Sequence, residues 1–452
     1  MNSKRLNRRI DQFFIQWKNS RFRRPLLVRG ARQVGKTYSV IHFAENQFSN
    51  HVVLNFEERP ELCKCFESFD VKEITDRVSI LTNAVITPGE TLLFIDEIQE
   101  CPSAIIALRY FFEKMPELHV IGAGSLLECA IKSSKFRMPV GRVTSVYMEP
   151  LNFSEFLDAT GHSKLDAYLN DVTLKKGIDR LYQEQLEQLL RKYLITGGMP
   201  AVVSAYVSGA IPREIQILQT SIIQTYQIDF SKYATTAQQK YLKDIFSAVP
   251  RLTGAICKYS HINPHVQSRD LKPAMALLSD ARCIYPVYHS SGHGVPLDAQ
   301  MNIKKFKLLF IDIGLMQRQL GLDTALITNE DIMTINQGSA TEQFIGQQLL
   351  SEIDCVEEKR IHFWLRETRS SQAEIDYLVQ LDRHVFAVEV KSGKTGTLKS
   401  LRIFLKEHPD TPFGIRFSLH ELSWHDQVLS IPLYMVNQWK RLAKETLNNK
   451  SG

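Results

Sequence analysis

A glycine-rich loop near the N-terminus carries the residues with the most specific chemistry. Residues 30–37 read Gly-Ala-Arg-Gln-Val-Gly-Lys-Thr, the G-x-x-x-x-G-K-[ST] spacing of a phosphate-binding loop. Its two glycines let backbone N–H groups point at phosphate oxygens. Lys36 then reaches the β- and γ-phosphates, and Thr37 offers its hydroxyl to Mg²⁺. The sequence therefore predicts a nucleoside-triphosphate site with these nucleotide-binding residues: Gly30, Ala31, Arg32, Gln33, Val34, Gly35, Lys36, Thr37 and Tyr38.

A pair of carboxylates follows about sixty residues later. The apolar run 91–95 ends in Asp96 and Glu97, and such continuous runs are typical of strands buried on both faces of a parallel sheet. We expect Asp96 to be the second metal residue beside Thr37, holding Mg²⁺ through water. Glu97 would be catalytic, because a carboxylate there can orient the water that attacks the γ-phosphate. The alternative for the two acids is an ordinary solvated strand end.

A second group of chemically active residues lies near the C-terminus. Glu389 and Lys391 alternate along one strand-like segment, and Asp376 lies on the segment before it, so a hairpin would bring all three to one face. Glu342, on an amphipathic helix at 341–350, would complete the shell. Carboxylates and an ammonium arranged in this way can bind Mg²⁺ and activate water for phosphodiester cleavage. The alternative is a solvated hairpin whose salt bridge contributes at most about 1 kcal/mol.

The elements that position these residues follow an α/β pattern. Apolar strand segments alternate with helical segments up to residue 150, which predicts a parallel sheet covered by helices. Helix-like sequence then continues to residue 230, and two strand segments, 283–288 and 306–311, come after further short helices. That order suggests a winged helix, for which DNA contact and plain domain packing are both open. The predicted domains are 1–150, 151–235, 236–334 and 335–452.

Bulk properties exclude several classes of protein. A chain of 452 residues is too long for one core. Its formal charge of +6 is mild and hints at nucleic acid without establishing it. Its seven scattered cysteines do not form a disulfide framework, so we expect reduced thiols and a cytoplasmic location. No apolar stretch is long enough to span a bilayer, so we expect no membrane partner.

Together these residues resemble one family, the predicted prokaryotic AAA+ superfamily ATPases with a C-terminal domain of unknown function. Nearly the whole chain carries its markers, which lie at 29–37, 94–99, 124–125, 141–142, 150–156, 197–200, 312–315, 374–376 and 389–391. The resemblance implies ATP and Mg²⁺ as cofactors. It also implies a P-loop AAA+ core, a helical lid, a winged-helix segment and a C-terminal α/β domain similar to PD-(D/E)xK restriction endonucleases. One departure is Glu374, which stands where many such nucleases carry proline.

The resemblance adds two candidate catalytic residues. Ser125 follows the fourth expected strand, where the sensor residue of AAA+ ATPases positions the attacking water; a helix N-cap is the compatible alternative. Arg142 precedes the fifth strand, where AAA+ proteins place the arginine that reaches a neighbour's γ-phosphate. Arg137 is the other candidate for this role, and an ordinary surface arginine is the structural alternative.

Two functions from different classes remain open at this stage. In the first, the chain hydrolyses ATP and acts as a nucleotide-driven switch that binds DNA or a partner protein through its C-terminal half. In the second, it is an ATP-regulated, Mg²⁺-dependent DNA nuclease in defence or DNA processing. Candidate partners besides ATP are DNA, a second copy in a homo-oligomer, and a different protein.

Overall fold

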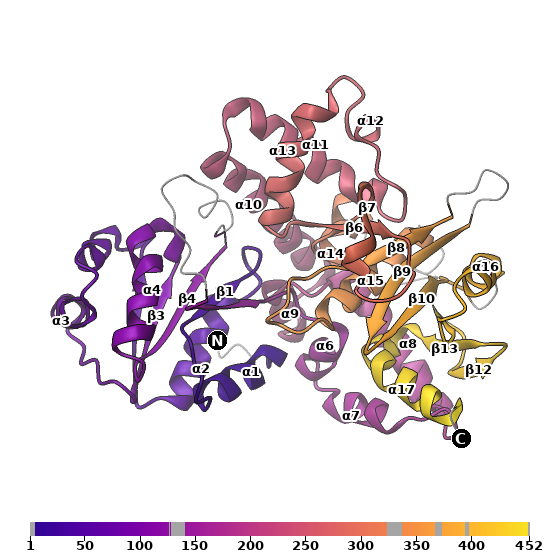
Figure 1. The fold of residues 1–452 in the computed structure, drawn as a ribbon, viewed down its shortest axis with the longest axis horizontal. Helices are drawn as coiled ribbons and strands as arrows, with labels where there is room; N and C mark the ends of the chain where they lie inside the picture. Colours follow the sequence, from indigo (N-terminus) through magenta and orange to yellow (C-terminus); the bar gives the residue numbers. More distant parts are fainter. Residues whose placement is uncertain are drawn as a thin grey trace.

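Two β-sheets and a helical region between them organise the chain. The computed structural model describes residues 5–125, 127, 141–322, 337–366, 373–393 and 397–450. Figure 1 shows the N-terminal sheet at the left, the C-terminal sheet at the right, and helices α10, α11 and α13 above them. The expected α/β class, with a parallel-sheet domain followed by helices, is confirmed.

The N-terminal sheet has five strands in the order β2-β3-β4-β1-β5, and all neighbours are parallel. The strands are β1 (Leu26–Arg29), β2 (Asn50–Asn55), β3 (Thr91–Asp96), β4 (His119–Gly124) and β5 (Thr144–Tyr147). Each of them was expected from an apolar segment of the sequence. Because parallel strands end at the same edge, the P-loop after β1, the acids after β3 and Ser125 after β4 lie at one edge of this sheet.

Alternating side chains of these strands enter two different cores. Leu26 and Val28 pack with α1 (Arg9–Lys18) and α2 (Lys36–Gln47), whereas Leu27 packs with α3 (Val71–Thr82) and α4 (Pro102–Lys114). This division follows from the twofold side-chain period of a strand. The first core continues through the helical region into the C-terminal sheet, so the two halves of the chain share one buried apolar interior.

Nine helices occupy the described residues between 153 and 319. They are α6 (Phe153–Ala159), α7 (Ser163–Asp171), α8 (Arg180–Thr196), α9 (Pro200–Val207), α10 (Pro212–Tyr233), α11 (Thr236–Leu252), α12 (Tyr259–Ile262), α13 (Ser268–Asp280) and α14 (Ile313–Gln319). The longest is α10, which has 22 residues. Its C-terminal end reaches the P-loop, as described below.

The C-terminal sheet is mixed and has eight strands in the order β12-β13-β11-β10-β9-β8-β6-β7. The strands are β6 (Ile284–Ser290), β7 (Met301–Phe310), β8 (His362–Leu365), β9 (Glu374–Leu381), β10 (His384–Val390), β11 (Gly414–Ser418), β12 (Ser423–His425) and β13 (Val428–Pro432). The helices α15 (Gln337–Ser351), α16 (Lys399–Glu407) and α17 (Trp439–Lys450) accompany it. Short 3₁₀ segments complete the elements: η1 (Pro60–Phe66), η2 (Ile98–Glu100), η3 (Leu297–Gln300) and η5 (Leu433–Gln438).

The two strands expected as a wing are part of this C-terminal sheet. They pair with each other antiparallel, as a wing would, but β6 also pairs parallel with β8 through Tyr288 and His289. A free wing leaves a strand edge unpaired, and here β8 satisfies that edge. The sequence gives no direct sign of this pairing, because β6 and β8 are separated by more than seventy residues.

A buried polar junction explains three of the sequence markers without assigning them chemistry. Asp312, which is fully buried, accepts hydrogen bonds from Gly198 N at 2.6 Å and from Leu315 N at 3.0 Å, and Gln347 Nε2 lies 3.3 Å away. Leu151 N in turn donates to Gly198 O at 2.7 Å. A side chain at Gly198 would collide with the Leu151 backbone. These residues therefore join the AAA side of the chain to α14 and α15.

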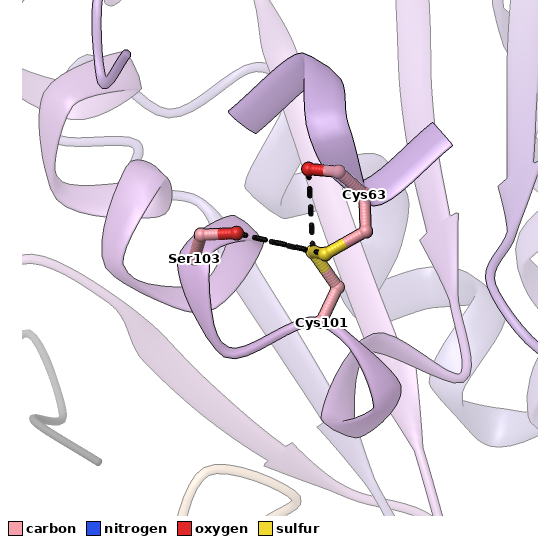
Figure 2. Close-up of a disulfide and its surroundings, with 3 residues drawn as sticks. All are labelled: Cys63, Cys101 and Ser103. Carbon is pink, nitrogen blue, oxygen red and sulfur yellow. Dashed lines mark hydrogen bonds between the residues drawn. A yellow bond between two sulfur atoms is a disulfide. The ribbon is translucent and has the colours of Figure 1, made fainter. Parts of the chain in front are cut away.

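One expectation about the cysteines is wrong. Cys63 and Cys101 form a disulfide, and the Ser103 hydroxyl lies 3.3 Å from Cys101 Sγ (Figure 2). The bond joins η1 to the residue that precedes α4. Their separation of 38 residues hides the pairing from the sequence, because only the fold brings their Cα atoms to 5.6 Å. Four other described cysteines are not disulfide-bonded: Cys65, Cys257, Cys283 and Cys355. The cytoplasmic location loses the support of uniformly reduced thiols and stays a prediction.

Within the described ranges, no helix combines the length and the apolar character that crossing a membrane requires.

Candidate nucleotide-binding site

The P-loop has the backbone geometry that its glycines predict. Gly30 and Gly35 have φ values of +154° and +94°, and Gln33 is also left-handed at +65°. A side chain at Gly30 would collide with the carbonyl oxygen of Met148. Gly35 is the N-cap of α2, so the first turn of that helix opens at the loop. The N–H groups of a first turn have no partner within their own helix, which is why such a turn suits an anion. The loop also has no room for a larger residue at Gly30.

The cation of the motif lies within the loop, and its hydroxyl lies beside the end of β3. Lys36 is buried, and its Nζ donates to the carbonyl oxygens of Gly30 at 3.0 Å and Ala31 at 2.8 Å. Thr37 Oγ1 donates to Asp96 Oδ2 at 2.8 Å. Burial raises the pKa of Asp96, while the hydrogen bond from Thr37 lowers it. The structure thus joins the P-loop to the end of β3 through the pair predicted to hold Mg²⁺.

Glu97 follows β3 in a left-handed conformation with φ +47° and ψ +44°. Gln99 Nε2 donates to its Oε2 at 2.6 Å, which holds the carboxylate beside Asp96. Gln99 in turn lies against β4, where a side chain at Gly124 would collide with it. The sequence did not predict a role for Gln99. The one feature that could have indicated it is that Gln99 comes two residues after Glu97.

The remaining predicted catalytic residues have different surroundings. Ser125 is buried directly after β4, the neighbour of β3 in the sheet. Arg142 lies before β5 with 45% of its side chain exposed, and its Nε donates to Glu113 on α4 at 2.9 Å. Arg137 lies outside the described residues. Arg142 is thus a half-exposed arginine whose guanidinium pairs with the carboxylate of Glu113.

Two sets of side-chain contacts hold the P-loop from outside, one through Arg8 and one through Arg32. Arg8, the N-cap of α1, donates to Val34 O at 2.9 Å and pairs with Glu155 on α6 at 3.1 Å. Beside these contacts, a cavity of about 210 Å³ adjoins Gly35. The cavity is lined by Leu6, Arg8, Gly35, Tyr38, Ser39, Pro200 and Ser204. Tyr38, the last predicted nucleotide-binding residue, therefore lies on the wall of a hollow next to the phosphate loop.

The other set of contacts connects the P-loop to α10. Arg32 Nη1 lies 2.9 Å from both carboxylate oxygens of the buried Asp229, and Tyr226 donates its hydroxyl to Arg32 O at 2.5 Å. Glu57, after β2, lies 3.6 Å from Arg32 and 2.8 Å from Lys232. Asp229 and Tyr226 were missed by sequence reasoning, because nothing in their local pattern points to a residue almost two hundred positions away.

The C-terminal candidate residues surround a lysine that the sequence did not indicate. Lys307 on β7 pairs with Glu342 on α15 at 2.9 Å, contacts Glu374 on β9, and lies 3.8 Å from Asp376. Only 2% of the Lys307 side chain is exposed. The one available signal was a lysine inside the apolar strand segment 306–311. Glu342 and Asp376 thus converge on an ammonium group, whereas the sequence predicted that they would converge on a metal ion.

The other half of the predicted cluster forms a separate ion pair. The hairpin of β9 and β10 is present, and Asp376 Oδ2 accepts a hydrogen bond from Val390 N at 2.7 Å. Glu389 Oε1 pairs with Lys391 Nζ at 2.5 Å. Burial, then the charge of Asp376, raises the pKa of Glu389 to about 7; the same two causes raise the pKa of Glu342 to about 7. Across the described residues, no group of three or more His, Cys, Asp or Glu side chains has the geometry to hold a metal ion.

Comparisons with known proteins assign the N-terminal part. A family model described as an AAA domain matches residues 22–157. Two domains of unknown function follow, DUF8612 at 187–326 and DUF4143 at 337–434. No curated protein matches the sequence significantly.

Three solved structures are partly similar to this chain, each with a TM-score of 0.30 or lower. The Aeropyrum pernix ORC1 protein in complex with DNA is 12% identical, with 71% of this chain and 92% of that chain covered and a TM-score of 0.28. The Thermotoga maritima RuvB Holliday junction branch migration motor is 16% identical, with 61% and 87% covered and a TM-score of 0.30. A STAND signal-transduction ATPase from Pyrococcus horikoshii is 14% identical, with 77% and 48% covered and a TM-score of 0.27. From the family matches, the chain carries an AAA domain at residues 22–157, followed by two domains of unknown function.

Proposed function

We propose that the protein binds and hydrolyses ATP at the P-loop and transmits its nucleotide state to the C-terminal half through α10. The observation that carries this proposal is the continuous set of contacts from Asp96 through Thr37 and the P-loop to Asp229 on α10. A phosphate-binding loop alone supports nucleotide binding. The direct contact of that loop with a helix outside the AAA match supports a switch.

The residues of the loop fit a Mg²⁺-bound triphosphate. In the proposal, Lys36 exchanges its two carbonyl partners for the β- and γ-phosphates. A charged phosphate oxygen is a stronger hydrogen-bond partner for an ammonium than a neutral carbonyl oxygen is. Thr37 and Asp96 supply the oxygen ligands that Mg²⁺ prefers, directly and through water. Mg²⁺, when bound, would offset charge on the phosphates. Glu97 orients the attacking water, and Ser125 holds it from the neighbouring strand.

The cavity beside Gly35 is proposed to receive the nucleotide base. Its wall combines apolar surface from Leu6, Pro200 and Tyr38 with the Ser39 and Ser204 hydroxyls. Small-molecule sites are typically apolar hollows with a few polar groups that fix orientation. Because Pro200 and Ser204 belong to α9, a bound base would also join the AAA side to the helical region.

The proposal is tested by measuring ATP binding and Mg²⁺-dependent turnover of the full chain. We expect binding with one nucleotide per chain and turnover that EDTA abolishes. A folded protein that binds no ATP at millimolar concentration would overturn the proposal.

Arg142 is proposed to act across a subunit interface of a homo-oligomer. Its side chain is 45% exposed and, among the described residues, pairs with the carboxylate of Glu113, so it is able to reach a neighbouring copy. We expect the ATPase rate per chain to rise with protein concentration, and the Arg142→Ala protein to lose that rise while still binding ATP, because a trans arginine stabilises charge only in the transition state. Arg109→Ala, which removes the other arginine on Glu113, is the matched control. A rate per chain that stays flat over a hundredfold dilution excludes the role.

The nuclease alternative stays a prediction. In its favour, the β9–β10 hairpin brings Asp376 next to the strand of Glu389, as the prediction requires. Against it, the carboxylates expected to hold Mg²⁺ are paired with Lys307 and Lys391. DNA contact by the helices before β6 is likewise a prediction.

A further inference from the structure

Lys307 has surroundings that an ordinary surface lysine never has. It lies in the last part of β7, among buried apolar neighbours, with its Nζ 5.4 Å from the centre of the Phe363 ring. Three carboxylates reach it, one from α15 and two from β9. An ammonium in such a place needs opposite charge nearby, because transfer of an unpaired ion from water costs several kcal/mol.

The carboxylates, for their part, need a cation nearby. Glu342 and Asp376 are largely buried, and without a cation their charges would repel each other inside the protein. Hard divalent ions such as Mg²⁺, Mn²⁺ and Ca²⁺ are bound by clusters of carboxylate oxygens of this kind. In this cluster the ammonium group of Lys307 supplies the positive charge that a metal ion would otherwise supply.

A second observation extends the cluster beyond the groups that Lys307 contacts. Glu389 has 7% of its side chain exposed, and its Oε2 has no hydrogen-bond partner among the described residues, although Oε1 is paired with Lys391. A buried carboxylate oxygen without a partner is costly. Glu389 Oε2 is therefore available to bind a metal ion if the ammonium leaves the cluster.

We propose that the Lys307 ammonium is the resident cation of the cluster formed by Glu342, Glu374, Asp376 and Glu389, and that it excludes a divalent metal ion from this site. Lys307 belongs to the segment matched by DUF8612, whereas the four carboxylates belong to the segment matched by DUF4143. One domain thereby fills the candidate metal site of the next. The proposal does not depend on ATP hydrolysis.

The test is Mn²⁺ binding to the full chain without nucleotide, followed by electron paramagnetic resonance. We expect Lys307→Ala to gain one Mn²⁺ site at least tenfold tighter than any site of the wild type. The added substitution Asp376→Asn should remove that gain. Lys304→Ala, which removes an exposed lysine of the same strand, is the matched control and should bind Mn²⁺ as the wild type does.

Two results overturn the proposal. One is a wild-type Mn²⁺ site that Asp376→Asn removes, because the ammonium would then not exclude the metal. The other is a folded Lys307→Ala protein with no gained site. If Lys307→Ala does not fold, Lys307→Gln keeps the bulk and hydrogen-bond donors without the charge. It should gain the same Asp376-dependent site, and a folded Lys307→Gln protein without one overturns the proposal equally.

Discussion

Replacing Lys36 with alanine is expected to weaken ATP binding by at least about a hundredfold and to abolish turnover. The phosphates lose the only ammonium that the motif directs at them. A charge-assisted hydrogen bond contributes about 1.5–3 kcal/mol, and about 1.4 kcal/mol corresponds to a tenfold change in affinity. Two such bonds therefore account for a loss of this size. Calorimetric titration with Mg·ATP measures it.

Glu97→Gln should impair turnover, whereas Lys36→Ala should impair ATP binding itself. The amide keeps the size of the side chain and leaves the phosphate loop intact, but it can no longer accept a proton from the attacking water, so kcat falls while ATP binding is retained. Glu100→Gln, three residues on and exposed, should keep wild-type turnover.

Tight ATP binding by a folded Lys36→Ala protein would refute the assignment of the loop.

The second large effect is expected at Asp312 and concerns stability. Asp312→Ala removes the acceptor of two backbone N–H groups in a fully buried junction. Each donor left without a partner costs about 1–3 kcal/mol, so we expect a loss of roughly 3–5 kcal/mol in the unfolding free energy of the unit that contains it. Thermal unfolding measures this as a lower midpoint.

Asp179→Ala provides the matched control for that experiment. Asp179 also caps a helix, since its side chain accepts from Leu181 N at 2.8 Å, but it is exposed. Water can satisfy the freed N–H group there, and loss of such a cap costs about 1 kcal/mol. A midpoint for Asp312→Ala no lower than that of Asp179→Ala would show that the buried junction does not contribute as described.

Local patterns were sufficient for the N-terminal sheet and its phosphate loop. The apolar run before Asp96 and the glycine spacing at 30–35 each depend on neighbouring residues, and both gave the observed strand and turn. For the same reason the C-terminal hairpin could be predicted, since two strand-like segments joined by a short connection place Asp376 and Glu389 on adjacent strands.

Contacts between distant segments could not be predicted in this way. Lys307 meets Glu342 only because β7 lies against α15, and Arg32 meets Asp229 only because the end of α10 lies over the P-loop. A lone lysine in an apolar strand and an acid near a helix end have many possible partners. The Cys63–Cys101 bond and the pairing of β6 with β8 were hidden for the same physical reason.

The most direct test of the switch is amide hydrogen exchange on the full-length Glu97→Gln protein, with and without Mg·ATP. The account predicts changed exchange in the P-loop and also in α10 (Pro212–Tyr233), around Tyr226 and Asp229. The same substitution combined with Arg32→Met should keep the P-loop change and lose most of the change in α10, because the ion pair to Asp229 is gone. Changes confined to residues 26–125, with α10 unaffected by ATP, would contradict the account.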